Sequence, residues 1–153
     1  MATSIFAELS AGVVTASASE AQTVAAAFAA ALPADATLAL HGNLGVGKTT
    51  FVQGLARGFG IAGHVTSPTF NIYTVHRSPA RTLVHLDAYR LDNARQIEEL
   101  LLEDFLVSPW CLAVEWPEKI SAWLPPGALH LDLGILPDER HSIRLLAGAG
   151  TGV

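Results

Sequence analysis

The stretch that most restricts the fold of this chain is residues 42–49, which read Gly-Asn-Leu-Gly-Val-Gly-Lys-Thr. They match the pattern G-x-x-x-x-G-K-[ST], a loop that joins the end of a strand to the start of a helix. Residues 37–40 alternate like a strand, and residues 48–57 carry apolar side chains at helical spacing. The motif stands in the context that it requires, which predicts an α/β fold around this loop.

Each residue type in this loop has a physical role in holding a phosphate group. The glycines allow backbone conformations that point successive N–H groups inward, and the following helix adds its positive end. Lys48 can reach the β and γ phosphates, and the Thr49 hydroxyl can bind a Mg²⁺ ion between them. The alternative is a glycine-rich turn with an incidental lysine. The binding residues predicted here are Asn43, Leu44, Gly45, Val46, Gly47, Lys48, Thr49 and Thr50.

Two acidic residues follow predicted strands and are candidate ligands of the same ion. Asp87 follows the strand expected at residues 82–86, and Glu115 follows the apolar run 111–114. Open α/β sheets bind ligands at the carboxyl ends of their strands, so either side chain could join Thr49 in a magnesium site. Each could also be only a polar residue that ends a strand, and the spacing does not divide the roles between them.

A hydroxyl-rich stretch, residues 66–70, lies between the loop and Asp87. Its Thr69 could reach the γ-phosphate or the metal ion, and the order of this stretch would then depend on the bound nucleotide. A plain loop with a capping hydroxyl explains the same residues.

Periodicity divides the rest of the chain into helices and strands. One helix opens at a capping-box-like Ser19 and ends before Pro33, and another covers residues 95–106. Two adjacent strand pairs suggest that part of the sheet is antiparallel. One domain, 1–153, is expected, with a loosely held arm at 1–15 and a frayed tail at 148–153. The other strands are expected at residues 70–75, 129–133 and 142–146.

Composition and charge exclude several classes of protein. The chain has 153 residues, of which 50% are hydrophobic and 15% charged, which suits one compact domain. The formal net charge of −5 opposes unaided binding of nucleic acid. The single cysteine, Cys111, excludes an internal disulfide and is expected to be an inert buried thiol.

The sequence has no segment that suggests membrane insertion or export. The longest apolar run, residues 24–32, is shorter than the roughly 20 residues of a membrane-spanning helix. No Lys or Arg precedes Lys48, so the charged start of a secretory signal is missing. We therefore expect a cytoplasmic protein that does not associate with membranes.

Other side chains carry weaker signals. The six histidines are scattered without metal-ligand spacing and are expected to be structural or surface residues. Trp116 could pack on a nucleotide or a partner, or be an ordinary core or surface residue. Segments typical of small GTPases, Asn-Lys-x-Asp and Asp-x-x-Gly, do not occur, and the arginines are too scattered for the lid of a nucleotide kinase.

Four motifs together resemble the TsaE family, the ATPase subunits of bacterial tRNA threonylcarbamoyladenosine biosynthesis. They are residues 42–50, 67–70, 85–91 and 115–117, in order and at compatible spacings. The resemblance implies a P-loop NTPase-like three-layer fold with a mixed, mainly parallel central sheet flanked by helices. It also implies an ATPase that binds ATP or ADP with Mg²⁺ and acts with the partner proteins TsaD and TsaB, reaching tRNA only through that complex.

The resemblance also assigns roles to individual residues. Lys48 would bind phosphate, Thr49 and Glu115 would hold Mg²⁺, and Asp87 would be a second acidic residue of the metal and water shell. Lys48, Asp87 and Glu115 are thus the predicted catalytic residues, and Thr49, Asp87 and Glu115 the predicted metal ligands.

Further from the loop, the resemblance is less specific. It places Thr69 in a nucleotide-responsive switch and Arg140 near the nucleotide. Leu101 stands in a stretch where relatives often have glycine. Two other functions stay open: a small-molecule kinase using the same loop, and a nucleotide-gated binding module without hydrolysis.

Overall fold

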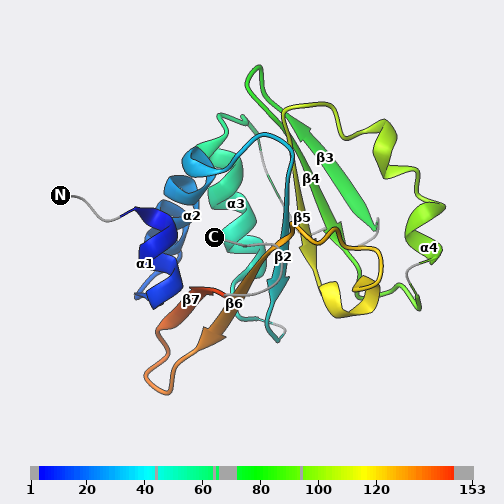
Figure 1. Ribbon diagram of the computed structural model, residues 1–153. Coiled ribbons are helices and arrows are strands. Elements are labelled where there is room, and N and C mark those ends of the chain that lie inside the picture. Colours follow the sequence, from blue (N-terminus) through cyan, green and yellow to red (C-terminus); the bar gives the residue numbers. More distant parts are fainter. Residues whose placement is uncertain (1–3, 44, 64, 66–71, 94, 147–153) are drawn as a thin grey trace.

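A computed structural model describes residues 4–43, 45–63, 65, 72–93 and 95–146. The described residues form a sheet with the strand order β1-β7-β6-β2-β5-β4-β3 (Figure 1). Its strands are β1 (Val13–Thr15), β2 (Ala36–His41), β3 (Tyr73–Arg77), β4 (Thr82–Asp87), β5 (Trp110–Glu115), β6 (Leu129–Ile135) and β7 (His141–Leu145).

The centre of the sheet is parallel and its edges are antiparallel. Strands β6, β2, β5 and β4 pair in parallel, whereas β1–β7, β7–β6 and β4–β3 pair antiparallel. Strands β2, β4 and β5 consist almost entirely of buried residues because both faces of the sheet are covered. The expectation of an α/β fold with a mixed, mainly parallel sheet is confirmed.

Helices α1 (Ile5–Ala11), α2 (Ala18–Ala31) and α3 (Lys48–Gly58) cover one face of this sheet (Figure 1). Phe28 of α2 and Phe51 of α3 are fully buried, with their ring centroids 6.2 Å apart. They belong to one apolar cluster with Leu38 of β2 and Leu131 of β6. This core fixes the position of α3 relative to β2.

Short helical segments cover the opposite face. They are α4 (Arg95–Glu98) and the 3₁₀ turns η1 (Leu102–Asp104) and η2 (Pro117–Ile120). Ile97, Leu102 and Ile120 are buried in a second cluster with Val84 of β4 and Val114 of β5. Because alternate residues of β4 and β5 enter different clusters, the sheet is the middle of three layers.

The N-terminal segment corrects one expectation. Residues 5–15 are not a loose arm, because α1 buries Leu9 completely and β1 pairs with β7. The sequence signal was weak because α1 has only seven residues and β1 finds its partner at the other end of the chain. The tail expected at 148–153 lies outside the described residues.

The start of α2 also differs from the expectation. Its N-cap is Ser17, not Ser19. The hydroxyl of Ser17 accepts a hydrogen bond from the Glu20 amide at 3.1 Å, and the Glu20 carboxylate accepts one from the Ala16 amide at 2.9 Å. This reciprocal pair satisfies two amides that a helix leaves without partners, so the helix begins two residues earlier.

The single helix expected at residues 95–106 is wrong. The chain forms α4 and then η1, and it turns at Leu101, whose φ is +53°. A left-handed residue does not continue a right-handed helix, so the chain leaves the helix at this point. The strand expected at 70–75 is observed at Tyr73–Arg77, and residues 70 and 71 lie outside the described residues.

The contact between α2 and α3 depends on glycine. A Cβ atom on Gly54 would lie 2.6 Å from both the Ala25 Cβ and the Gln22 carbonyl oxygen. We therefore expect Gly54→Ala to lower the free energy of unfolding by about 1–3 kcal/mol, despite the better helix propensity of alanine. Thermal unfolding should show a fall of about 2–4 °C per kcal/mol. Gly127→Ala, which meets open space, is the control, and equal stability of the two variants would contradict the close contact.

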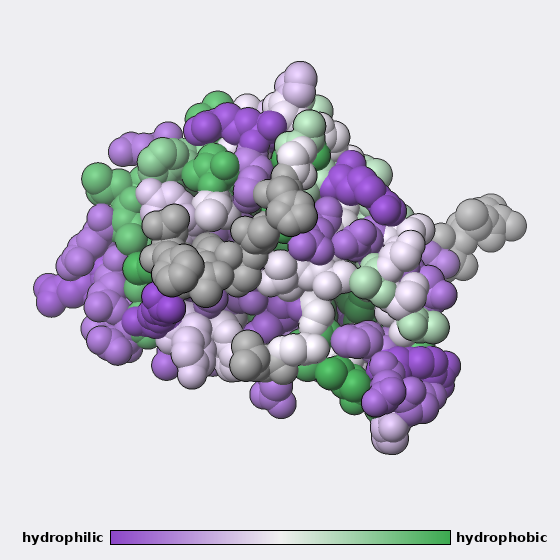
Figure 2. Space-filling view, turned by 180° about the vertical axis from the view of Figure 1, so that it is seen from behind, coloured by the Kyte–Doolittle hydropathy of each residue, from purple (hydrophilic) through white to green (hydrophobic). Residues whose placement is uncertain are grey.

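The outer surface is mixed in character. Within the described residues, no helix has the length and apolar character needed to cross a membrane. On the face shown in Figure 2, the apolar residues form several small groups separated by polar ones. The large apolar side chains that are exposed in the described part of the chain are Val14, Tyr89, Leu101, Val107 and Ile135.

Candidate functional site

The carboxyl ends of three neighbouring strands bring the predicted site residues to one edge of the sheet. Strand β2 leads into the loop at residues 42–47, and α3 begins directly after it at Lys48. Asp87 at the end of β4 and Glu115 at the end of β5 are direct cross-strand neighbours. Glu115 also stands opposite Leu40 of β2, just before the loop. Parallel pairing therefore places both carboxylates beside the loop.

The loop has the backbone geometry of an anion-binding nest. Gly42, Gly45 and Gly47 have φ values of +143°, +85° and +99°, which side chains rarely allow. A Cβ on Gly42 would lie 2.6 Å from the Leu133 carbonyl oxygen and from the Val46 side chain. No side chain of the described residues caps α3 at Gly47, so the first amides of α3 remain available for an anion.

Lys48 stands at the first position of α3 and is only 5% exposed. Its Nζ donates to the Gly42 carbonyl at 2.7 Å and lies 3.8 Å from the ring centroid of Trp116. Burial lowers the pKa of Lys48, while the carboxylates of Glu115 and Asp87 act in the opposite direction. Among the described residues no carboxylate forms an ion pair with this ammonium group. It can therefore pair with an incoming phosphate.

Glu115 and Thr49 are brought together at this edge. The Thr49 hydroxyl donates to Glu115 Oε2 at 3.4 Å, and Glu115 is 5% exposed. The same carboxylate oxygen lies 2.5 Å from Nε2 of His85, a fully buried residue of β4. The sequence analysis did not predict this contact between His85 and Glu115, although His85 belongs to one of the four motifs that resemble the family.

Asp87 is at the same edge but has a different partner. Its Oδ1 accepts a hydrogen bond from the Tyr89 amide at 2.9 Å, which stabilises the turn after β4. The Ala88 amide donates to the backbone carbonyl of Glu115 at 3.0 Å and ties this turn to β5. Asp87 is half-buried at this edge of the sheet.

The donor set fits a Mg²⁺ ion that is shared with a phosphate. A hydroxyl and one or two carboxylates are hard oxygen ligands, and Mg²⁺ in phosphate sites typically keeps waters and phosphate oxygens for its remaining positions. Within the described part of the chain, no three His, Cys, Asp or Glu side chains gather into a complete metal site. Thr49 and Glu115 would hold the ion, with Asp87 beside them.

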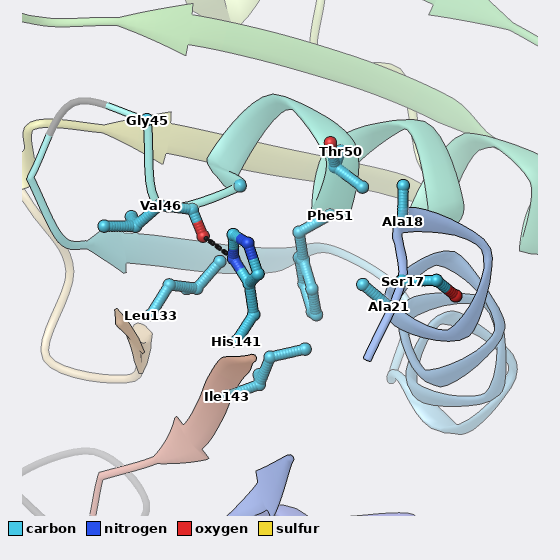
Figure 3. A pocket seen from close by; sticks show the side chains of 11 residues that line it. Ser17, Ala18, Ala21, Gly45, Val46, Thr50, Phe51, Leu133, His141 and Ile143 are labelled. Atoms are coloured by element: carbon cyan, nitrogen blue, oxygen red, sulfur yellow. Dashed lines mark hydrogen bonds between the residues drawn. The ribbon is translucent and has the colours of Figure 1, made fainter. Parts of the chain in front are cut away.

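A cavity of about 160 Å³ opens next to the loop (Figure 3). His141 at the start of β7 stands in its wall, and Nδ1 of this residue donates to the Val46 carbonyl at 3.0 Å. The wall combines the start of α2, the loop, α3 and the β6–β7 hairpin. Its residues are Ser17, Ala18, Ala21, Gly45, Val46, Gly47, Thr50, Phe51, Leu133, His141 and Ile143.

The other predicted binding residues have different placements. Asn43 is exposed at the tip of the loop. Arg140 lies on the exposed β6–β7 turn, where its Nε contacts Asp138 at 2.7 Å, and the residue that lines the cavity is its neighbour His141. Leu44 and Thr69 lie outside the described residues.

Trp116 and two histidines make side-chain contacts around the loop that their positions in the sequence did not indicate. Trp116 covers Lys48 with one ring face and packs against Tyr89, with 5.1 Å between ring centroids. His41, which precedes the loop, stacks on His130 of β6 with Nε2 and Nδ1 2.8 Å apart. Different strands carry these histidines, so their spacing in the sequence contained no signal.

Cys111 is fully buried, which raises the pKa of its thiol to about 12, as expected for an inert cysteine.

Comparison with known families identifies relatives over most of the chain. The model of the family "Threonylcarbamoyl adenosine biosynthesis protein TsaE" matches residues 15–143. A protein of Streptomyces coelicolor is 46% identical over 116 residues, which cover 74% of this chain and 78% of the relative. One from Rickettsia bellii is 38% identical over 122 residues, covering 79% and 84%. Both are described as tRNA threonylcarbamoyladenosine biosynthesis protein TsaE.

A solved structure has the same fold. The crystal structure of Bacillus subtilis YdiB superposes with a TM-score of 0.73 and 31% sequence identity. The superposition covers 88% of this chain and 82% of the other. The overall fold described above therefore recurs in a protein determined independently.

Proposed function

Because this chain belongs to the TsaE family of threonylcarbamoyl adenosine biosynthesis proteins, we propose that it is the magnesium-dependent ATPase subunit of the tRNA-modifying system. It would act in a complex with counterparts of TsaD and TsaB. Its part in threonylcarbamoyladenosine biosynthesis follows from the family. The binding of ATP, the dependence on Mg²⁺ and the two protein partners are what we propose in addition.

The meeting of Lys48, Thr49 and Glu115 at the N-terminus of α3 carries this proposal. A nearly buried ammonium group, a hydroxyl bonded to a carboxylate and a helix N-terminus without a side-chain cap lie together here. Such an arrangement suits a polyphosphate, because amides and Lys48 bind its oxygens while Thr49 and Glu115 face its metal ion. A bound Mg²⁺ would neutralise charge that develops on the phosphates during transfer.

The cavity beside the loop supports a nucleotide over inorganic polyphosphate. Phe51, Leu133 and Ile143 offer it apolar surface, and His141 closes it next to the Val46 carbonyl. A flat aromatic base suits such a wall, which Gly45 and Gly47 of the loop and Thr50 of α3 also line. We place the adenine of ATP there.

Direct contact with tRNA is not part of this proposal. The chain carries a formal net charge of −5, whereas proteins that bind nucleic acid by themselves usually present a basic stripe. The RNA would be bound by the partners, and this chain would supply nucleotide turnover.

The test is Mg²⁺-dependent phosphate release from ATP by the purified chain, first alone and then with the TsaD and TsaB counterparts of the same organism. We expect slow hydrolysis by the isolated chain, a clear rise with both partners, and loss of both activities in EDTA. Unchanged hydrolysis on addition of the partners would contradict the proposed role in the complex.

Two further measurements on the same protein separate the two alternative functions. Transfer of the γ-phosphate to a nucleoside, nucleotide or sugar in a panel of acceptors would identify a kinase. Tight ATP binding without phosphate release, alone or in the complex, would identify a nucleotide-gated binding module.

A further inference from the structure

We propose that His85 is a positioning residue that holds the Glu115 carboxylate against the Thr49 hydroxyl and so prepares it to bind the divalent cation. The inference rests on the proposed function, because it concerns the metal site of the same loop. It assigns a task to a buried histidine that the phosphate-binding motif does not include.

The sheet register places the two side chains on one face. His85 of β4 stands directly opposite Ala113 of β5, and Glu115 is two residues further along β5. Diagonal neighbours of this kind lie on the same face of a sheet and within reach of long side chains. That face is the one covered by α3, which carries Thr49. His85, Glu115 and Thr49 therefore meet between the sheet and the helix.

The hydrogen bond has a defined direction. An ionised carboxylate only accepts hydrogen bonds, so Nε2 of His85 donates to Glu115 Oε2 across 2.5 Å. Thr49 donates to the same oxygen at 3.4 Å, which leaves Oε1 of Glu115 for other partners. Among the described residues, Nδ1 of His85 has no hydrogen-bond partner, so its bond to Glu115 is the side-chain bond that the structure gives this ring.

Such an arrangement increases metal affinity by reducing the freedom of the ligand. A glutamate side chain has several rotamers, and holding it in one costs free energy each time an ion binds. The His85 ring is fully buried, and it can maintain that rotamer before the ion arrives. Removal of a hydrogen-bond partner behind a metal ligand typically costs about 10–100-fold in metal affinity.

Three substitutions separate positioning from a general structural role. His85→Gln keeps an N–H donor at nearly the same reach, His85→Leu fills similar space without a donor, and His85→Asn keeps a polar amide that is too short to reach Glu115. His76→Leu removes a second histidine close to His85, on the neighbouring strand, and serves as a control because His76 hydrogen-bonds to Thr74 and not to Glu115 or Thr49.

The measurement is calorimetric binding of ADP to the intact chain, with Mn²⁺ and with EDTA. For the wild-type chain we expect Mn²⁺ to increase ADP affinity. In His85→Leu and His85→Asn this increase should shrink about tenfold or more, with ADP affinity in EDTA unchanged. His85→Gln and His76→Leu should stay close to wild type. If the Leu variant does not fold, the Gln and Asn variants carry the comparison.

Two different failures can be told apart. A wild-type increase that persists in both His85→Leu and His85→Asn would overturn the positioning role and leave the proposed function standing. Equal loss of ADP affinity in EDTA and in Mn²⁺, not restored by His85→Gln, would also overturn it, because a purely structural defect behaves in this way. Absence of any Mn²⁺ effect in the wild-type chain would overturn the proposed metal site itself.

Discussion

Replacing Lys48 by alanine is expected to reduce ATP hydrolysis by about 10²–10³-fold, both for the chain alone and in the complex. The ammonium lies at the first position of α3 and 2.7 Å from the Gly42 carbonyl, between the nest and Trp116. The other lysine of the chain, Lys119, is exposed, and its Nζ lies 5.8 Å from the Tyr89 ring centroid. Without Lys48 the charge that develops on the transferred phosphate would lose its main protein partner.

The stability of the Lys48→Ala variant should not fall with its activity. Burial disfavours the charged form of this lysine, as its lowered pKa indicates, so its removal takes a costly group out of the folded protein. We expect a melting temperature equal to wild type or higher, measured by thermal unfolding. Lys119→Ala is the control and should hydrolyse ATP normally. Hydrolysis by Lys48→Ala within a few-fold of wild type would show that this loop does not perform the chemistry.

The second large effect is expected for Glu115→Gln, which keeps the shape of the side chain and removes its charge. Removing a hydrogen-bond partner behind a metal ligand typically lowers metal affinity or activity about 10–100-fold. Removing the charge of the ligand itself should have a larger effect, so we expect the rate of hydrolysis to fall more than about 100-fold. The defect should be partly relieved by raising the Mg²⁺ concentration, because the weakened step is binding of the ion. Phosphate release measured across a Mg²⁺ titration tests both points.

Asp87→Asn provides the comparison that distinguishes the role of Asp87 from that of Glu115. Glu115 is bonded to Thr49, whereas Asp87 holds the Tyr89 amide. We therefore expect a smaller loss of hydrolysis for Asp87→Asn than for Glu115→Gln. Glu99→Gln, on the exposed surface of the other layer, serves as the control. A larger loss in Asp87→Asn would assign the metal-binding role to Asp87 instead.

Much of the fold could be predicted because the relevant signals are local. An apolar run of strand length marked β5, and adjacent strands without a helix between them marked the two hairpins. The errors have a common physical cause. The β1 strand depends on a partner at the far end of the chain. The helix expected at residues 95–106 is interrupted at Leu101 by a left-handed backbone conformation, which the spacing of apolar residues does not reveal.

The sequence by itself determined the candidate phosphate-binding loop, because eight consecutive residues contain the glycines, the lysine and the hydroxyl that such a loop needs. It also determined that acidic residues end two strands of the sheet. Only the tertiary structure decided which side chains complete the site. His85 and Glu115 are 30 residues apart, and His141 and Val46 are 95 apart. Their contacts exist because strand order and register bring them together, and no local pattern encodes that order.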